Sequence, residues 1–85
     1  SQRQSERSVI VFGSMEASLT PLMEQIESSF PTVRVFSLPS VDHPSLGRHI
    51  ELGVKGRAPA LDAAYRDLLA GLRRLGAKLG SELVR

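Results

Sequence analysis

The chain has 85 residues, contains no cysteine and carries a formal net charge of +2, from eleven basic and nine acidic residues. This length allows one domain with a modest core, and the lack of cysteine excludes disulfides and cysteine-ligated metals. The charge is too balanced to indicate nucleic acid or an anionic membrane by itself, and no apolar run approaches the ~20 residues that cross a bilayer.

The two ends of the chain set the expected limits of the domain. Residues 1–7, SQRQSER, are polar and are expected to form a disordered or added tail before a single small domain at residues 8–80. They contain no apolar stretch like that of a secretory signal, so we expect a cytoplasmic protein. Because an initiator methionine is missing, we expect the chain to be a fragment of a longer protein.

The first half of the chain alternates between strand and helix patterns. The run SVIVF, residues 8–12, is nearly all apolar and predicts a buried strand. Apolar residues then recur at helical spacing from Leu19 to Phe30, which predicts a helix that ends before Pro31. The segment TVRVFSL, residues 32–38, predicts a second strand.

The second half begins with a proline-containing connection, residues 39–47, and continues with a clear alternation. In residues 48–56, RHIELGVKG, apolar and polar residues alternate, which predicts a strand with one wet face. A long helix that stops at Gly80 is predicted by a stripe of large apolar residues: Leu61, Tyr65, Leu68, Leu72, Leu75 and Leu79.

These elements predict an α/β (α+β) fold, a β-α-β-β-α two-layer sandwich. Its sheet would have three antiparallel strands in the order 1-3-2, with both helices on one face and the other face uncovered. The leucine stripe is short for a dimer seam, so it is expected to pack on the sheet. The predicted core consists of Val9, Val11, Leu22, Ile26, Val33, Val35, Ile50, Leu52, Val54, Leu61, Leu68, Leu72 and Leu75.

Residues able to do chemistry are few and scattered. His43 lies beside Asp42, and His49 shares a strand face with Glu51, but a metal site needs three or four converging ligands. The turn GSME after the first strand lacks the lysine and further glycines of a P-loop, and the chain has no G-x-S-x-G nucleophile motif. We therefore expect no metal site, no cofactor and no enzymatic activity.

The uncovered sheet face is the expected interaction surface, made by Phe36, Arg48, His49, Glu51 and Lys55. Further basic residues at Arg57, Arg73, Arg74 and Lys78 could give this surface a basic rim. RNA-binding modules of this general shape stack bases on sheet aromatics, and here Phe36 is the single outward aromatic expected. Nucleic acid is therefore not the expected partner.

Three stretches resemble the small KH-like module of CinA-type competence/damage-inducible proteins. VIVFGSMEASLTPLMEQI resembles the strand, glycine turn, E-S/A-x-L and helix that open this module, and FPTVRVFSLPS resembles its P-x-V-x-x-G-S-Y-P passage. HIELGVKGR, with the leucine-rich helix after it, resembles the closing strand and helix. The resemblance covers residues 8–79, although Phe36 stands where the family often has glycine and Leu38 where it often has an aromatic residue.

This resemblance implies a function and a partner. In CinA-type proteins, and in FAD synthetases that carry a molybdopterin-binding-like domain, the module follows a MoaB/Mog-type domain. The chain would then be a non-catalytic accessory domain of a molybdopterin-binding protein, in contact with that neighbouring domain or with a sister subunit. The alternative is a regulatory module of ferredoxin-like or KH-like type that binds a small ligand or RNA, and the lack of a fourth predicted strand argues against the ferredoxin-like form.

Overall fold

The computed structural model describes residues 3–13, 16–39 and 47–85 of the chain. Within these ranges, strands and helices follow one another in the order β-α-β-β-α-β, so a final strand is added to the five expected elements. The elements are β1 (Ser5–Phe12), α1 (Glu16–Ser29), β2 (Arg34–Pro39), β3 (His49–Gly56), α2 (Ala60–Arg74) and β4 (Lys78–Val84).

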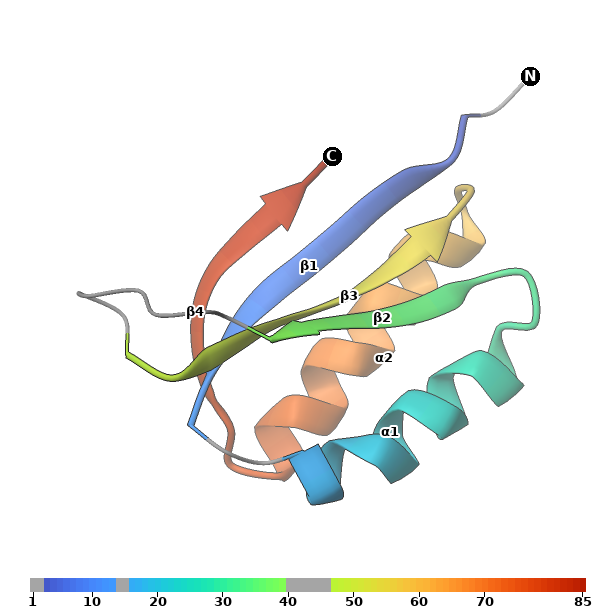
Figure 1. Ribbon diagram of the computed structural model, residues 1–85. Coiled ribbons are helices and arrows are strands. Elements are labelled where there is room, and N and C mark those ends of the chain that lie inside the picture. Colours follow the sequence, from blue (N-terminus) through green and yellow to red (C-terminus); the bar gives the residue numbers. More distant parts are fainter. Residues whose placement is uncertain (1–2, 14–15, 40–46) are drawn as a thin grey trace.

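The strands form one antiparallel sheet in the order β2-β3-β1-β4 (Figure 1). As predicted, β3 lies between β1 and β2, with Leu52 opposite Val9 and Val54 opposite Val35. The additional strand, β4, lies along the other edge of β1. The predicted sheet is therefore right in the order of its three strands and wrong in their number.

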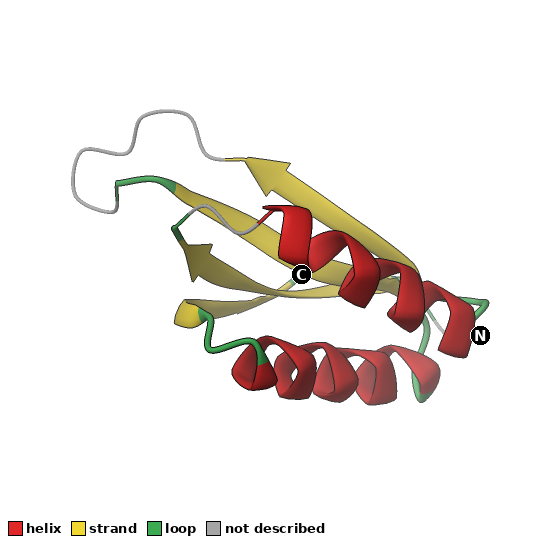
Figure 2. Ribbon diagram, turned by 90° about the horizontal axis from the view of Figure 1, so that it is seen from below, coloured by secondary structure: helices red, strands yellow, loops and turns green. Residues whose placement is uncertain are grey.

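Both helices pack on the same face of the sheet, as the view in Figure 2 shows. Leu61, Leu68 and Leu72 form the buried stripe of α2, and Gly71 leaves room on the same helix for Leu22 of α1. In the described part of the chain, neither helix is long and apolar enough to cross a membrane. The opposite side of the sheet carries neither helix and is called the open face below.

The end of α2 differs from the prediction. The sequence pattern extends this helix to Gly80, but it ends at Arg74, and Gly76 follows with a φ of +73°. Glycine adopts this left-handed conformation without a Cβ clash and often ends helices. The N–H groups of Gly76 and Ala77 donate to carbonyls of the last helical turn. The chain therefore turns back early, and Leu79 lies in β4 rather than on the helix.

The first strand is longer than predicted. It begins at Ser5, because the main chain of Glu6 exchanges two hydrogen bonds with Arg85, at 2.9 and 2.8 Å. Residues 5–7, which the polar sequence assigned to a tail, are therefore part of the sheet.

The core between the sheet and the helices contains all the predicted residues except two. Val35 is only partly buried, and Leu75 is 42% exposed because α2 ends just before it. Three further residues of this apolar core were not predicted: Leu19, Ala64 and Tyr65.

Candidate functional site

The open face is the candidate site, and the strand register decides which side chains it presents. Alternate residues of a strand point to opposite sides of a sheet, so Ser8 and Gly53 pair on the open face between core residues. In the described chain, the open face includes Glu6, Ser8, Ile10 and Phe12 of β1, Arg34, Phe36 and Leu38 of β2, His49, Glu51, Gly53 and Lys55 of β3, Lys78, Gly80 and Leu83 of β4, and Arg85 directly after β4.

A β-bulge decides which side chains of β4 reach this face. Val9 is opposite Glu82 and Val11 is opposite Leu79, so β4 has one residue more than β1 between these pairs. One extra residue reverses the alternation of the strand beyond it. As a result, Leu83 lies on the open face, whereas Glu82 lies on the helix side.

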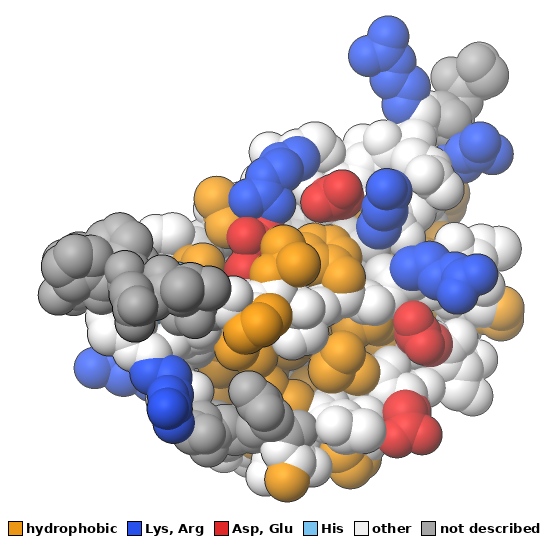
Figure 3. Space-filling model, viewed as in Figure 1, with side chains coloured by type: hydrophobic (Ala, Val, Ile, Leu, Met, Phe, Trp, Pro, Cys, Tyr) orange, Lys and Arg blue, Asp and Glu red, His pale blue; other side chains and the backbone are white. Residues whose placement is uncertain are grey.

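The middle of the open face is an apolar patch of five side chains: Ile10, Phe12, Phe36, Leu38 and Leu83. Two glycines make room for its rings. A Cβ at Gly53 would lie 2.5 Å from Cζ of Phe36, and a Cβ at Gly80 would lie 2.7 Å from Cε2 of Phe12. Each ring thus occupies the space that a side chain would need. Figure 3 shows hydrophobic side chains gathered over the middle of this face, with Lys and Arg around them.

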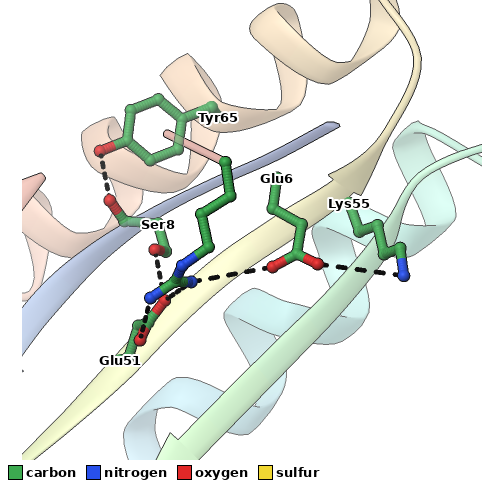
Figure 4. A network of polar contacts seen from close by, with 6 residues as sticks. Glu6, Ser8, Glu51, Lys55 and Tyr65 are labelled. Carbon is green, nitrogen blue, oxygen red and sulfur yellow. Dashed lines mark hydrogen bonds and ion pairs between the residues drawn. The ribbon is translucent and has the colours of Figure 1, made fainter. Parts of the chain in front are cut away.

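The carboxylate of Glu51 lies next to the apolar patch, because Glu51 is opposite both Ile10 and Leu38 in the sheet. Figure 4 shows its polar contacts. Nη1 and Nη2 of Arg85 donate to the two carboxylate oxygens of Glu51 at 2.5 and 3.2 Å, and the hydroxyl of Ser8 donates at 2.7 Å. The hydrogen bonds from Arg85 hold the pKa of the Glu51 carboxyl below its ordinary value of 4.5, although burial opposes this shift. Because only 14% of this side chain is exposed, the carboxylate is occupied by its own neighbours.

A row of charged side chains crosses the sheet at one end of the apolar patch. Arg34 is opposite Lys55, Lys55 is opposite Glu6, and Glu6 is opposite Arg85. The Glu6 carboxylate lies 3.9 Å from Nζ of Lys55 and 3.8 Å from Nη1 of Arg85. These charges, with Glu51, leave an excess of positive charge at this end.

The other end of the apolar patch combines aromatic and basic groups. Nζ of Lys78 lies 5.9 Å from the ring centroid of Phe12, within cation–π range. The ring of His49 lies 6.3 Å from that of Phe12, and its Nδ1 is 3.0 Å from the carbonyl oxygen of Gly47. This end is therefore also positively charged.

On the helix side of the sheet, Tyr65 ties α2 to two strands. Its hydroxyl lies 2.6 Å from Oε1 of Glu82 and 3.2 Å from the carbonyl oxygen of Ser8. The guanidinium of Arg7 lies 4.3 Å from the ring centroid and donates to Asp62 at 3.0 Å. Burial raises the pKa of the Tyr65 phenol, and the hydrogen bond with Glu82 raises it further. The phenol therefore stays protonated and donates its hydrogen to Glu82.

The structure places the residues predicted for the interaction surface as follows. Phe36, His49, Glu51 and Lys55 lie on the open face, as their strand positions predicted. Arg48 is exposed directly before β3.

Several side chains of the open face were not predicted from the sequence. They come from β1, from β4 and from the residue after β4: Ser8, Ile10, Phe12, Leu83 and Arg85. The first three follow a regular alternation in a strand that was read as wholly buried. The last two depend on a strand that the helical spacing of the leucines concealed.

Metal and cofactor sites were not expected, and these predictions stay open. Within residues 3–13, 16–39 and 47–85, no three His, Asp or Glu side chains are grouped so that they could hold a metal ion. His43 and its neighbour Asp42, and Ser14 and Met15 of the GSME turn, lie outside the described residues.

Hollows lie elsewhere on the molecule. One of about 450 Å³ at the end of β3 is lined by Gln4, Thr32, Gly56, Arg57, Ala58, Pro59 and Ala60. Another, of about 220 Å³ and lined in part by Leu22 and Leu75, lies between the helices. The charged residue in the lining of the hollow at β3 is Arg57, and that in the lining of the hollow between the helices is Arg74. Neither lining contains a carboxylate or histidine that could form an acid–base pair.

A solved protein has a similar fold. The crystal structure of a Dabb family protein with a ferredoxin-like fold, from Mesorhizobium loti, matches 98% of this chain and 94% of its own chain, with a TM-score of 0.55. This chain has a ferredoxin-like fold. The sequence identity is 18%, so the likeness concerns the fold alone. No model of a known protein family and no curated protein matches the chain.

This match corrects the resemblance drawn from the sequence. The CinA-type module was expected to have three strands, whereas the ferredoxin-like chain has four and matches a solved ferredoxin-like protein over nearly its whole length. The resemblance to CinA-type proteins is therefore wrong, and so is the function as accessory domain of a molybdopterin-binding protein.

Proposed function

We propose that this ferredoxin-like chain is a non-catalytic binding module that contacts another protein through the open face of its sheet. The observation that carries the proposal is the apolar patch, which lies where neither helix covers the sheet. Leu38 is 52% exposed, and the other four side chains of the patch are half-buried. A contiguous apolar patch that stays accessible is typical of protein interaction sites. A sister subunit was one of the partners expected from the sequence. Binding to a sister subunit can be detected as self-association of the isolated chain.

The reactive groups near the open face support binding over catalysis. Ser8 is 0% exposed, and its hydroxyl donates to Glu51, so it offers no accessible nucleophile. Glu51 is itself held by Arg85. The buried phenol of Tyr65 lies on the helix side of the sheet, where it bonds Glu82. Each group is thus engaged in holding the fold together.

RNA is a weaker candidate for the same face. Phe12 and Phe36 lie on β1 and β2, and the strand between them presents no aromatic ring except that of His49. Base stacking on neighbouring rings, which RNA-binding sheets use, therefore has little support here.

A small apolar ligand is also less favoured than a protein. Small-molecule sites are usually concave and enclose most of the ligand. The hollows described above lie at the end of β3 and between the helices, away from the apolar patch. Neither of the two hollows described above encloses the apolar patch, so we favour a broad protein contact over a small ligand.

Two binding measurements test the proposed function. The first is sedimentation velocity over a wide range of concentration, which detects self-association. The second is titration with a helical peptide that carries a leucine stripe flanked by glutamine, which detects apolar binding to protein without the help of charge. Both are repeated with Phe36→Ser and Leu38→Ser on the open face. Leu75→Ser, at an exposed apolar side chain beyond α2, is the matched control.

The expected result is self-association or peptide binding that both open-face variants weaken and Leu75→Ser leaves unchanged. Leu38 is 52% exposed, so its replacement tests the surface without disturbing the core. A monomer that binds no peptide would contradict the proposal. So would binding that persists in both open-face variants, or binding only to single-stranded RNA with a steep loss as salt rises.

A further inference from the structure

Basic side chains stand at both ends of the apolar patch. Arg34, Lys55 and Arg85 belong to the charged row at one end, and Lys78 stands beside Phe12 at the other. Arg34 and Lys78 form no ion pair with any described residue. These cations are therefore available to a partner that covers the patch.

The carboxylates of this face are already occupied. Glu51 accepts hydrogen bonds from Arg85 and Ser8, and Glu6 lies within 4 Å of both Lys55 and Arg85 (Figure 4). The described residues of the open face include four basic side chains and two carboxylates. Both carboxylates already have basic partners within the chain, so the face has an excess of positive charge. A second copy of the chain would bring the same positive excess against this one, and like charges across an interface oppose binding.

We propose that the partner of the open face is an acidic amphipathic protein segment, with an apolar stripe flanked by carboxylates. The inference rests on the proposed function, because it specifies the chemistry of the partner on the same face. The apolar stripe would cover Phe36, Ile10 and Leu83, while its carboxylates would reach Arg34 and Lys55 on one side and Lys78 on the other. Because cations lie at both ends of the apolar patch, a partner with carboxylates on both sides of its apolar stripe would pair with both sets.

The test compares three helical peptides that share one leucine stripe and differ only in their flanks, which are Glu, Gln or Lys. Their affinities for the chain are measured by fluorescence anisotropy at low and at moderate salt. Arg34→Glu and Lys55→Glu reverse charges at exposed positions of the open face. Arg66→Glu, at an exposed position of α2 on the other side of the sheet, is the matched control.

The Glu-flanked peptide is expected to bind about tenfold more tightly than the Lys-flanked one, because several rim pairs each contribute a modest amount. Salt should narrow this difference by screening the charges. Arg34→Glu and Lys55→Glu should remove or reverse the preference, whereas Arg66→Glu should leave it unchanged.

The outcomes separate this inference from the proposed function. If all three peptides bind equally well, or if the chain associates only with itself, the charge inference fails and the open face remains a protein-binding surface. If no peptide binds and the chain stays monomeric, both proposals fail. Salt-sensitive binding of single-stranded RNA that Lys55→Glu abolishes would also overturn both, since the cations would then serve phosphates.

Discussion

The ring of Phe36 lies over Gly53, with its Cζ 2.5 Å from the place where a Cβ of residue 53 would be. The two residues are direct partners in the pairing of β2 with β3. The same Cβ would also lie 2.6 Å from Cβ of Ser8 and 2.7 Å from the carbonyl oxygen of Arg7. The apolar patch thus depends on a missing side chain in the strand beneath it.

Gly53→Ala is therefore expected to destabilise the fold and to displace the Phe36 ring. A methyl group at this position meets a backbone oxygen as well as the ring, and overpacking of this kind costs about 1–3 kcal/mol. Urea unfolding would measure the loss, and Ser37→Ala, at an exposed position of β2, is a control. Equal stability of Gly53→Ala and the unmodified chain would mean that Phe36 does not lie over Gly53.

Tyr65→Phe should lower the free energy of unfolding by about 1–2 kcal/mol, because it removes the hydroxyl that bonds Glu82 and lies near the Ser8 carbonyl. Glu82→Gln keeps an acceptor for that hydroxyl and should cost less. Thermal or urea unfolding of the two variants gives the comparison. Tyr65→Phe with unchanged stability would contradict the role of this hydroxyl in joining α2 to β4.

Glu51→Gln tests the paired carboxylate of the open face. Because the pKa of Glu51 lies below 4.5 in the folded chain, its ionised form stabilises the fold above pH 4.5, and this contribution is lost as the pH falls through the folded pKa. The variant should be less stable than the unmodified chain near neutral pH, and the difference should shrink in acid. Urea midpoints across that pH range measure this, with Glu24→Gln on α1 as a control. A difference that is constant with pH would rule out the ion pair with Arg85.

Leu68→Ala tests the packing of α2 on the sheet. Leu68 is 0% exposed, and removing a buried leucine side chain costs about 2–5 kcal/mol. This is a large share of the stability of a small domain. Leu75→Ala, at a side chain that is 42% exposed, should change the unfolding free energy far less. Similar losses in the two variants would place Leu75 in the core and extend α2 beyond Arg74.

The sequence predicted those elements whose periodicity is regular. Ile50, Leu52 and Val54 alternate without interruption, and the buried face of β3 follows from them. The stripe of Leu61, Leu68 and Leu72 likewise predicted α2 and its packing on the sheet. Because β3 pairs with both β1 and β2, these patterns were enough for the order of three strands.

The fourth strand escaped prediction for two physical reasons. Leu79 lies four residues after Leu75, so it fits a helical stripe by spacing alone, and the helix stop at Gly76 depends on a backbone angle that composition does not reveal. The bulge in β4 then breaks the alternation that would mark a strand. The bond of Glu51 with Arg85 joins residues 34 positions apart, and without β4 nothing brings them together.

The most direct test of the open face as the protein-binding surface is an amide NMR map of the isotope-labelled chain during titration with the Glu-flanked peptide. The predicted result is a set of shifts at Ile10, Phe36, Gly53 and Leu83, with the exposed residues of α1 and α2 unaffected. Shifts confined to the groove between the helices, or no shifts at all in a chain that also stays monomeric, would contradict binding through the open face.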